Sequence, residues 1–153
     1  MTAHLVATTL ALLGAGVIYG TDVFGALVLV PAAARARDAS VADLLGWVHE
    51  FGDRRLPAPG MVGLLGSVAS AWLAPSSPTR ALALIAAGLQ AAWLVLYATV
   101  SAPLNRHLRA AARAGETPAE TRAWQQRWGA VIWPRAALQA AAVAALLGAA
   151  WAT

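Results

Sequence analysis

Asp22 and Arg135 are the first residues whose types and positions indicate chemistry, because each is a charged side chain within a long apolar stretch. A charge at such a position is unfavourable in a membrane unless it meets a partner. Asp22 lies eight residues before Val30, near the end of its stretch, and Arg135 lies six residues after Gly129, near the start of another. At 1.5 Å per residue, the two side chains lie about 12 and 9 Å from the same boundary. We therefore predict an Asp22–Arg135 pair, either as a contact that fixes helix register or as an anion or proton site facing a cavity.

Further polar side chains recur at helical spacing in the apolar stretches. The third stretch carries such a stripe at Gln90, Tyr97, Ser101 and Asn105, the fourth carries one at Trp124, Trp128, Arg135 and Gln139, and Tyr19 lies one turn before Asp22. Stripes of this kind commonly form hydrogen bonds between membrane helices. The alternative is a pocket, open toward the cytoplasm, that binds a flat, apolar molecule carrying a few oxygens.

Histidines and carboxylates between the apolar stretches are weak candidates for a metal site. His49 and Asp53 are four residues apart and share a helical face, and His107 lies near the same boundary. They can bind a metal only if the fold brings them together, and histidines in separate segments are more often solvated. The chain has no cysteine, which excludes disulfides and thiolate ligands.

The composition identifies the kind of element that must position these residues. Hydrophobic residues make up 59% of the 153 residues, and charged residues make up 12%. Four apolar runs approach or exceed the roughly 20 residues that cross a bilayer as a helix. We predict one all-α domain over residues 1–153, a bundle of four transmembrane helices at about 5–30, 59–73, 81–102 and 129–151. The first run has no preceding cation and is too long for a signal peptide, so we treat it as a span.

The connections give an orientation. Short interfacial helices are predicted at 40–51 and 105–114, within the two long connections. Nine arginines lie in these connections, against Arg80 alone in the other flanks. The positive-inside rule therefore predicts a multi-pass protein of the inner (plasma) membrane, with cytoplasmic long connections and extracytoplasmic termini. The net charge of +4 is accounted for by these arginines facing lipid, and no nucleic-acid recognition module accompanies them.

Several short motifs together resemble the anthrone oxygenase-like family of small four-helix membrane proteins, long classed as a domain of unknown function. These motifs are Pro31 at the end of a span, Pro103-Leu104-Asn105 after the third span, and Arg127-Trp128, Trp133 and Arg135 at the fourth. Asn105, Trp128 and Arg135 match recurring family positions. Ile132 stands where many members have a histidine, which puts chemistry by a histidine there in doubt and leaves His49 as a substitute.

The resemblance implies oxidation of an anthrone-type carbon by O₂ in bacterial secondary metabolism, without an organic cofactor and with a transition metal as the open alternative. Arg135 and Asn105 would then stabilise an oxyanion, with Asp22 or His49 as the base. Tyr97, Trp128 and Trp133 would flank the rings. The competing interpretations are a small-molecule carrier and an accessory or structural subunit of the membrane, as a monomer or a homo-oligomer. The sequence shows no internal inverted repeat of the kind that would favour a carrier.

Overall fold

The computed structural model describes residues 2–152, which form five continuous helices. Two of these helices contain a short π-helical segment. The first comprises α1 (Thr2–Phe24), the π-helical segment Gly25–Leu29 and α2 (Val30–Arg35), and the second is α3 (Asp38–Arg55). After α4 (Pro57–Trp72), the fourth helix comprises α5 (Ser77–Leu96), the π-helical segment Tyr97–Ser101 and α6 (Ala102–Ala114), and the fifth is α7 (Thr121–Trp151).

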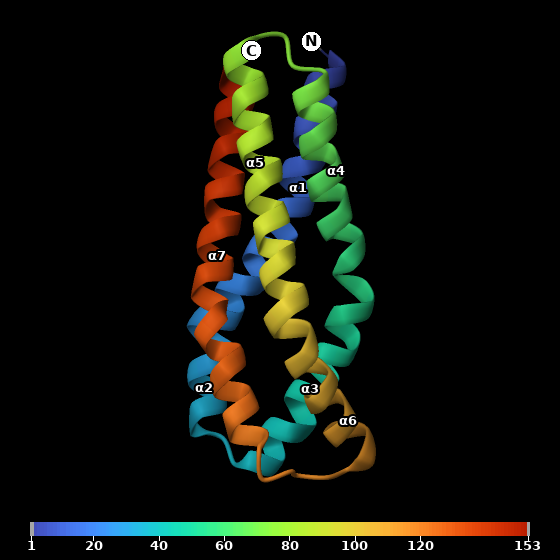
Figure 1. Ribbon diagram of the computed structural model, residues 1–153, viewed down its shortest axis with the longest axis vertical. Helices are drawn as coiled ribbons and strands as arrows, with labels where there is room; N and C mark the ends of the chain where they lie inside the picture. Colours follow the sequence, from blue (N-terminus) through green and yellow to red (C-terminus); the bar gives the residue numbers. More distant parts are fainter. Residues whose placement is uncertain (1, 153) are drawn as a thin grey trace.

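Helices α1, α4, α5 and α7 lie side by side along the long axis of the molecule (Figure 1). At one end, the His4 ring lies 3.0 Å from the carbonyl oxygen of Ser70, and Thr79 donates to the carbonyl of Ala152 at 3.1 Å. Both ends of the described chain therefore lie at this end. Helices α3 and α6 pack on one another at the opposite end (Figure 1).

Pro31 and Pro103 do not end their helices, contrary to the spans predicted from the sequence. Each proline is the second residue after a π-helical segment, with Val30 or Ala102 between them. Proline lacks an N–H and its ring clashes with the carbonyl four residues earlier in an α-helix. The π-turn widens the backbone there, with bonds from Val30 N–H to Gly25 and from Ala102 N–H to Tyr97, so the helices continue to Arg35 and Ala114.

Glycines allow the close contact of α1 with α4. A Cβ added to Gly14 would lie 2.4 Å from the backbone nitrogen of Gly63, and one added to Gly66 would lie 2.8 Å from that of Ala11. Small residues permit such approaches between apolar helices. The contact fixes α1 and α4 as neighbours, and both helices carry residues of the site described below.

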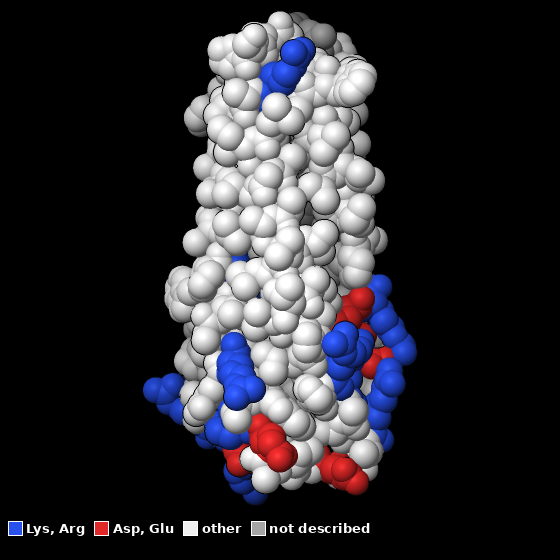
Figure 2. Space-filling view, viewed as in Figure 1, with Lys and Arg blue, Asp and Glu red and all other residues white. Residues whose placement is uncertain are grey.

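The outer surface is apolar along most of its length. Each of the four long helices exposes large apolar side chains, for example Leu13, Leu65, Val95 and Leu147. Three of the five helices, Thr2–Arg35, Ser77–Ala114 and Thr121–Trp151, are long and apolar enough to cross a membrane, whereas α4 has 16 residues. Charged side chains gather over the end formed by α3 and α6 (Figure 2). The chain is therefore a membrane protein with a lipid-compatible body.

Candidate functional site

A buried ion pair joins α1 and α7. Arg135 Nη2 donates to Asp22 Oδ1 at 2.6 Å, and Arg135 Nη1 donates to Ser101 Oγ at 2.8 Å. Both charged side chains are almost fully buried. The matching depths of Asp22 and Arg135 in the sequence led to the prediction of this pair, and the structure contains it.

Two aromatic rings, Trp93 on α5 and Tyr97 at the start of the next π-helical segment, surround the pair. Trp93 Nε1 donates to Asp22 Oδ2 at 2.6 Å, so both oxygens of the carboxylate are hydrogen-bonded. The rings of Trp93 and Tyr97 stack with centroids 5.6 Å apart, and the Arg135 guanidinium lies 4.9 Å from the Trp93 centroid and 5.6 Å from the Tyr97 centroid. Such cation–π contacts stabilise a guanidinium that is buried away from water. Arg135 is therefore held by a carboxylate, a hydroxyl and two rings.

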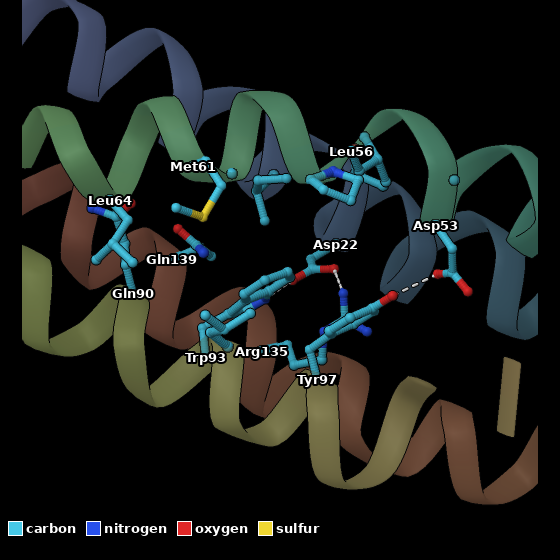
Figure 3. A pocket seen from close by; sticks show the side chains of 16 residues that line it. Asp22, Asp53, Leu56, Met61, Leu64, Gln90, Trp93, Tyr97, Arg135 and Gln139 are labelled. Carbon is cyan, nitrogen blue, oxygen red and sulfur yellow. Dashed lines mark hydrogen bonds and ion pairs between the residues drawn. The ribbon is translucent and has the colours of Figure 1, made fainter. Parts of the chain in front are cut away.

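The pair forms part of the wall of a cavity of about 210 Å³ between α1, α4, α5 and α7. Figure 3 shows Asp22, Arg135, Trp93 and Tyr97 on one side and Met61 and Leu64 across from them. Gln90 and Gln139 lie toward the same end of the cavity as Leu64 (Figure 3). The lining is thus mostly apolar and carries a few charged and hydrogen-bonding groups, which is typical of small-molecule sites.

A second set of hydrogen-bonded polar side chains connects this cavity to the charged end of the molecule. Asp53, at the cavity wall, accepts hydrogen bonds from Tyr97 Oη at 2.7 Å and from Asn105 Nδ2 at 2.9 Å. Arg109 lies 3.3 Å from the other oxygen of Asp53. Asn105 therefore contacts the cavity only through Asp53, and the oxyanion role that the resemblance gave to Asn105 does not match its position.

His49 lies behind the cavity wall, where its ring packs on Trp128 with centroids 5.1 Å apart. Burial lowers the pKa of His49 to about 4, with Asp53 opposing the shift and Arg135 and Arg109 adding to it. Above that pH the ring is neutral. Neither His49 nor Trp128 lines the cavity, and the His49 Nε2 and Trp128 Nε1 atoms have no hydrogen-bond partner among residues 2–152.

The weak metal candidates do not form a cluster. His107 stacks on Trp124 with centroids 4.9 Å apart, while Asp53 binds Tyr97, Asn105 and Arg109. Within residues 2–152, no group of three His, Cys, Asp or Glu side chains could hold a metal ion.

Besides Trp128, two further predicted ligand-binding residues lie outside the cavity wall. Trp133 is 57% exposed on the outer face of α7. It is two residues before Arg135, so at 100° per residue the two side chains lie about 200° apart around the helix. Tyr19 is half-buried on α1, one turn before Asp22. Gln90, Tyr97 and Gln139, by contrast, do line the cavity as their spacing predicted.

Sequence reasoning missed Trp93, which binds the Asp22 carboxylate. The signal was present, because Trp93 is three residues after Gln90 and four before Tyr97, on the same helical face. A search for polar residues alone passes over tryptophan, although its indole N–H is a donor that needs a partner when it is buried.

No protein-family model matches the chain, and comparison with curated proteins and with solved structures returns no match either.

Proposed function

We propose that this protein is a membrane-embedded oxygenase-like enzyme that oxidises a flat, hydrophobic, anthrone-type molecule with O₂. One observation carries the proposal: the Asp22–Arg135 pair forms part of the wall of an otherwise largely apolar cavity. An ion pair that only fixed the helix register would not need to border a cavity. The family resemblance of the sequence supports the same reaction class.

The reaction consumes one O₂ and yields anthraquinone and one water from each anthrone. A base removes one proton from the CH₂ carbon opposite the ketone, and the resulting negative charge is shared with the ketone oxygen. The anion transfers one electron to O₂, the two radicals combine, and a proton converts the product into a hydroperoxide. Loss of the remaining hydrogen on that carbon, with cleavage of the O–O bond, releases water and leaves the second carbonyl.

The residues at the cavity wall suit the first step of this sequence. Asp22 is the nearest carboxylate to the Arg135 cation and is the candidate base, while Arg135 stabilises the developing oxyanion. Trp93 and Tyr97 offer a flat wall for the rings. Asp53 replaces His49 as the second candidate base, because Asp53 lines the cavity and His49 does not.

We further propose four membrane spans, with α4 as the fourth. At 16 residues α4 is about 24 Å long, somewhat short of a bilayer core of about 30 Å. Its outward residues Leu65, Val68 and Trp72 are nevertheless exposed and apolar. Helices α3 and α6 would lie at the cytoplasmic interface of the plasma membrane, because the arginines concentrate there and the positive-inside rule then directs both termini outward.

The test is O₂ consumption and anthraquinone formation with anthrone at neutral pH, using purified protein in lipid vesicles and empty vesicles as the background. The expected ratio of O₂ consumed to quinone formed is about one. Asp22→Asn and Arg135→Met should each reduce the rate roughly 100-fold or more, because general bases and oxyanion donors contribute at least this much. Arg113→Met is the control, since Arg113 pairs with Glu50 outside the cavity wall.

The double variant Asp22→Asn/Arg135→Met separates catalysis from architecture. Folding is followed by circular dichroism and by the elution volume of the detergent complex. A folded double variant that is as active as the unsubstituted protein would reduce the pair to a structural contact. No turnover above the vesicle background would favour a carrier or an accessory subunit.

A further inference from the structure

The cavity has two chemically different sides. The charged groups of the lining are Asp22, Arg135 and Asp53, with the amides of Gln90 and Gln139 at one end, whereas Ile18, Met61 and Leu64 are purely apolar. Its volume of about 210 Å³ is below the roughly 300–1,000 Å³ of typical ligand pockets. A ligand larger than one small ring system would therefore extend beyond the cavity.

The apolar side reaches the outer surface of the molecule. Met61 on α4 and Leu94 on α5 both line the cavity, yet they are 45% and 41% exposed. Helices α4 and α5 lie side by side along the long axis and are joined by a short connection at one end (Figure 1). The cavity therefore opens sideways between these two helices rather than only toward the charged end.

The surface around this opening is apolar. Leu65, one turn after Met61, and Val95, next to Leu94, are exposed large apolar side chains. No Asp, Glu, Lys or Arg occurs between Pro57 and Trp72 in α4, and none occurs between Ala81 and Leu96 in α5. Surfaces of this composition face hydrocarbon rather than water.

We propose that ligands enter the cavity from the bilayer, between α4 and α5, and belong to the class of lipid-dissolved molecules. The oxygen-bearing ring then lies against Asp22 and Arg135, and any apolar remainder lies between Met61 and Leu94. The identity of the ring rests on the function proposed above, whereas the direction of entry rests on the opening alone.

The absence of cysteine makes the route measurable by thiol labelling. Gln139→Cys places a thiol on the cavity wall, and Ala142→Cys places one on the same helix in the packed core. In vesicles, the uncharged N-ethylmaleimide should label Gln139→Cys at least tenfold faster than Ala142→Cys, and a charged methanethiosulfonate should label neither. Equal rates of N-ethylmaleimide labelling at the two positions, or labelling of Gln139→Cys by the charged reagent, would overturn the proposal.

A second variant closes the cavity from within. A Cβ added to Gly60 meets Ile18 at 3.7 Å, an ordinary contact, so a larger side chain there extends into the cavity. Gly60→Leu should slow N-ethylmaleimide labelling of Gln139→Cys at least tenfold. The control is Gly88→Leu on α5, where an added Cβ meets no atom within 4 Å and should leave the labelling rate unchanged. An unchanged rate in Gly60→Leu would contradict entry through this cavity.

Labelling and turnover can fail separately. Rapid labelling of Gln139→Cys with no oxidation of anthrone would leave the lateral entrance in place and refute the proposed reaction. Oxidation of anthrone without labelling of Gln139→Cys from the bilayer would support the proposed reaction and refute the lateral entrance.

Discussion

His49 makes the stability of this protein depend on pH in a way that can be calculated. The ring is buried against Trp128, and burial lowers its pKa from the ordinary 6.5 to about 4. The folded protein therefore holds His49 neutral at a pH where the unfolded chain binds a proton. Its contribution to stability is fully present above about pH 6.5 and is lost as the pH falls toward 4.

The difference between the two pKa values corresponds to about 3 kcal/mol in full. Between about pH 7.5 and pH 5, the part that is lost is about 2 kcal/mol. For a chain of this length, that loss lowers the unfolding midpoint by roughly 4–8 °C. Glu50 adds little to the change in stability in this window, because its hydrogen bond from Arg113 lowers the pKa of its carboxyl below the usual value.

The assay is thermal unfolding in detergent, followed by tryptophan fluorescence at the two pH values. His49→Gln keeps a polar side chain but does not titrate. Between pH 7.5 and pH 5, its unfolding midpoint should therefore fall by roughly 4–8 °C less than that of the unsubstituted protein. His107→Gln, which removes an exposed histidine, is the matched control. An identical pH response of the unsubstituted protein and His49→Gln would refute the reasoning.

Further substitutions test the close contact of α1 with α4, the buried ion pair and the connection between α2 and α3. Gly14→Ala should lower stability by about 1–3 kcal/mol, because its Cβ meets α4 backbone. Gly16→Ala, with open space at its Cβ, should be neutral or slightly stabilising in the same thermal assay. Asp22→Asn should lower stability by about 3–5 kcal/mol through the unpaired Arg135, and adding Arg135→Met should recover part of it; equal losses would exclude a coupled pair. Arg122→Met should speed proteolysis between α2 and α3, because Arg122 binds the carbonyls of Ala33 and Ala36 and the Asp38 carboxylate; unchanged cleavage would contradict this.

The sequence was sufficient to predict what depends on depth and composition. Asp22 and Arg135 were matched by their distances from a common boundary, and burial forces such charges to pair. The apolar stretches similarly indicated helices that cross a membrane. These inferences hold because they use only the rise per residue of a helix and the low polarity of lipid.

The close packing of backbone against backbone between helices was beyond such reasoning. Gly16 and Gly20 in α1 have the four-residue spacing of a GxxxG pair, but a Cβ added to either meets no atom within 4 Å. The close approach uses Gly14 instead, together with Gly63 on α4. Which glycine faces a neighbour depends on the azimuth of the whole helix, and a sequence rich in small residues does not specify it.

The π-helical segment Tyr97–Ser101 explains why Asn105 was misplaced. The prediction extended one stripe from Gln90 to Asn105 at a constant 100° per residue. A π-turn contains about one extra residue, so it rotates everything after it by roughly 100° relative to an uninterrupted α-helix. Asn105 therefore turns from the cavity toward Asp53 on α3, while Tyr97, at the start of the segment, stays at the cavity wall.

The same distortion builds the site. Tyr97 begins the π-helical segment and binds Asp53, and Ser101 ends it and accepts a hydrogen bond from Arg135. The other π-helical segment starts at Gly25, three residues after Asp22. Regular α-helices at these positions would turn α2 and α6 to other faces and lose the contact of α6 with α3 that holds Asp53 through Asn105 and Arg109. Pro31 and Pro103 stabilise the distortions because each disfavours the regular turn before it. Replacing Pro103 by alanine removes that bias, so we expect weaker ordering of Tyr97 and Asp53 around the cavity before any loss of the long helices.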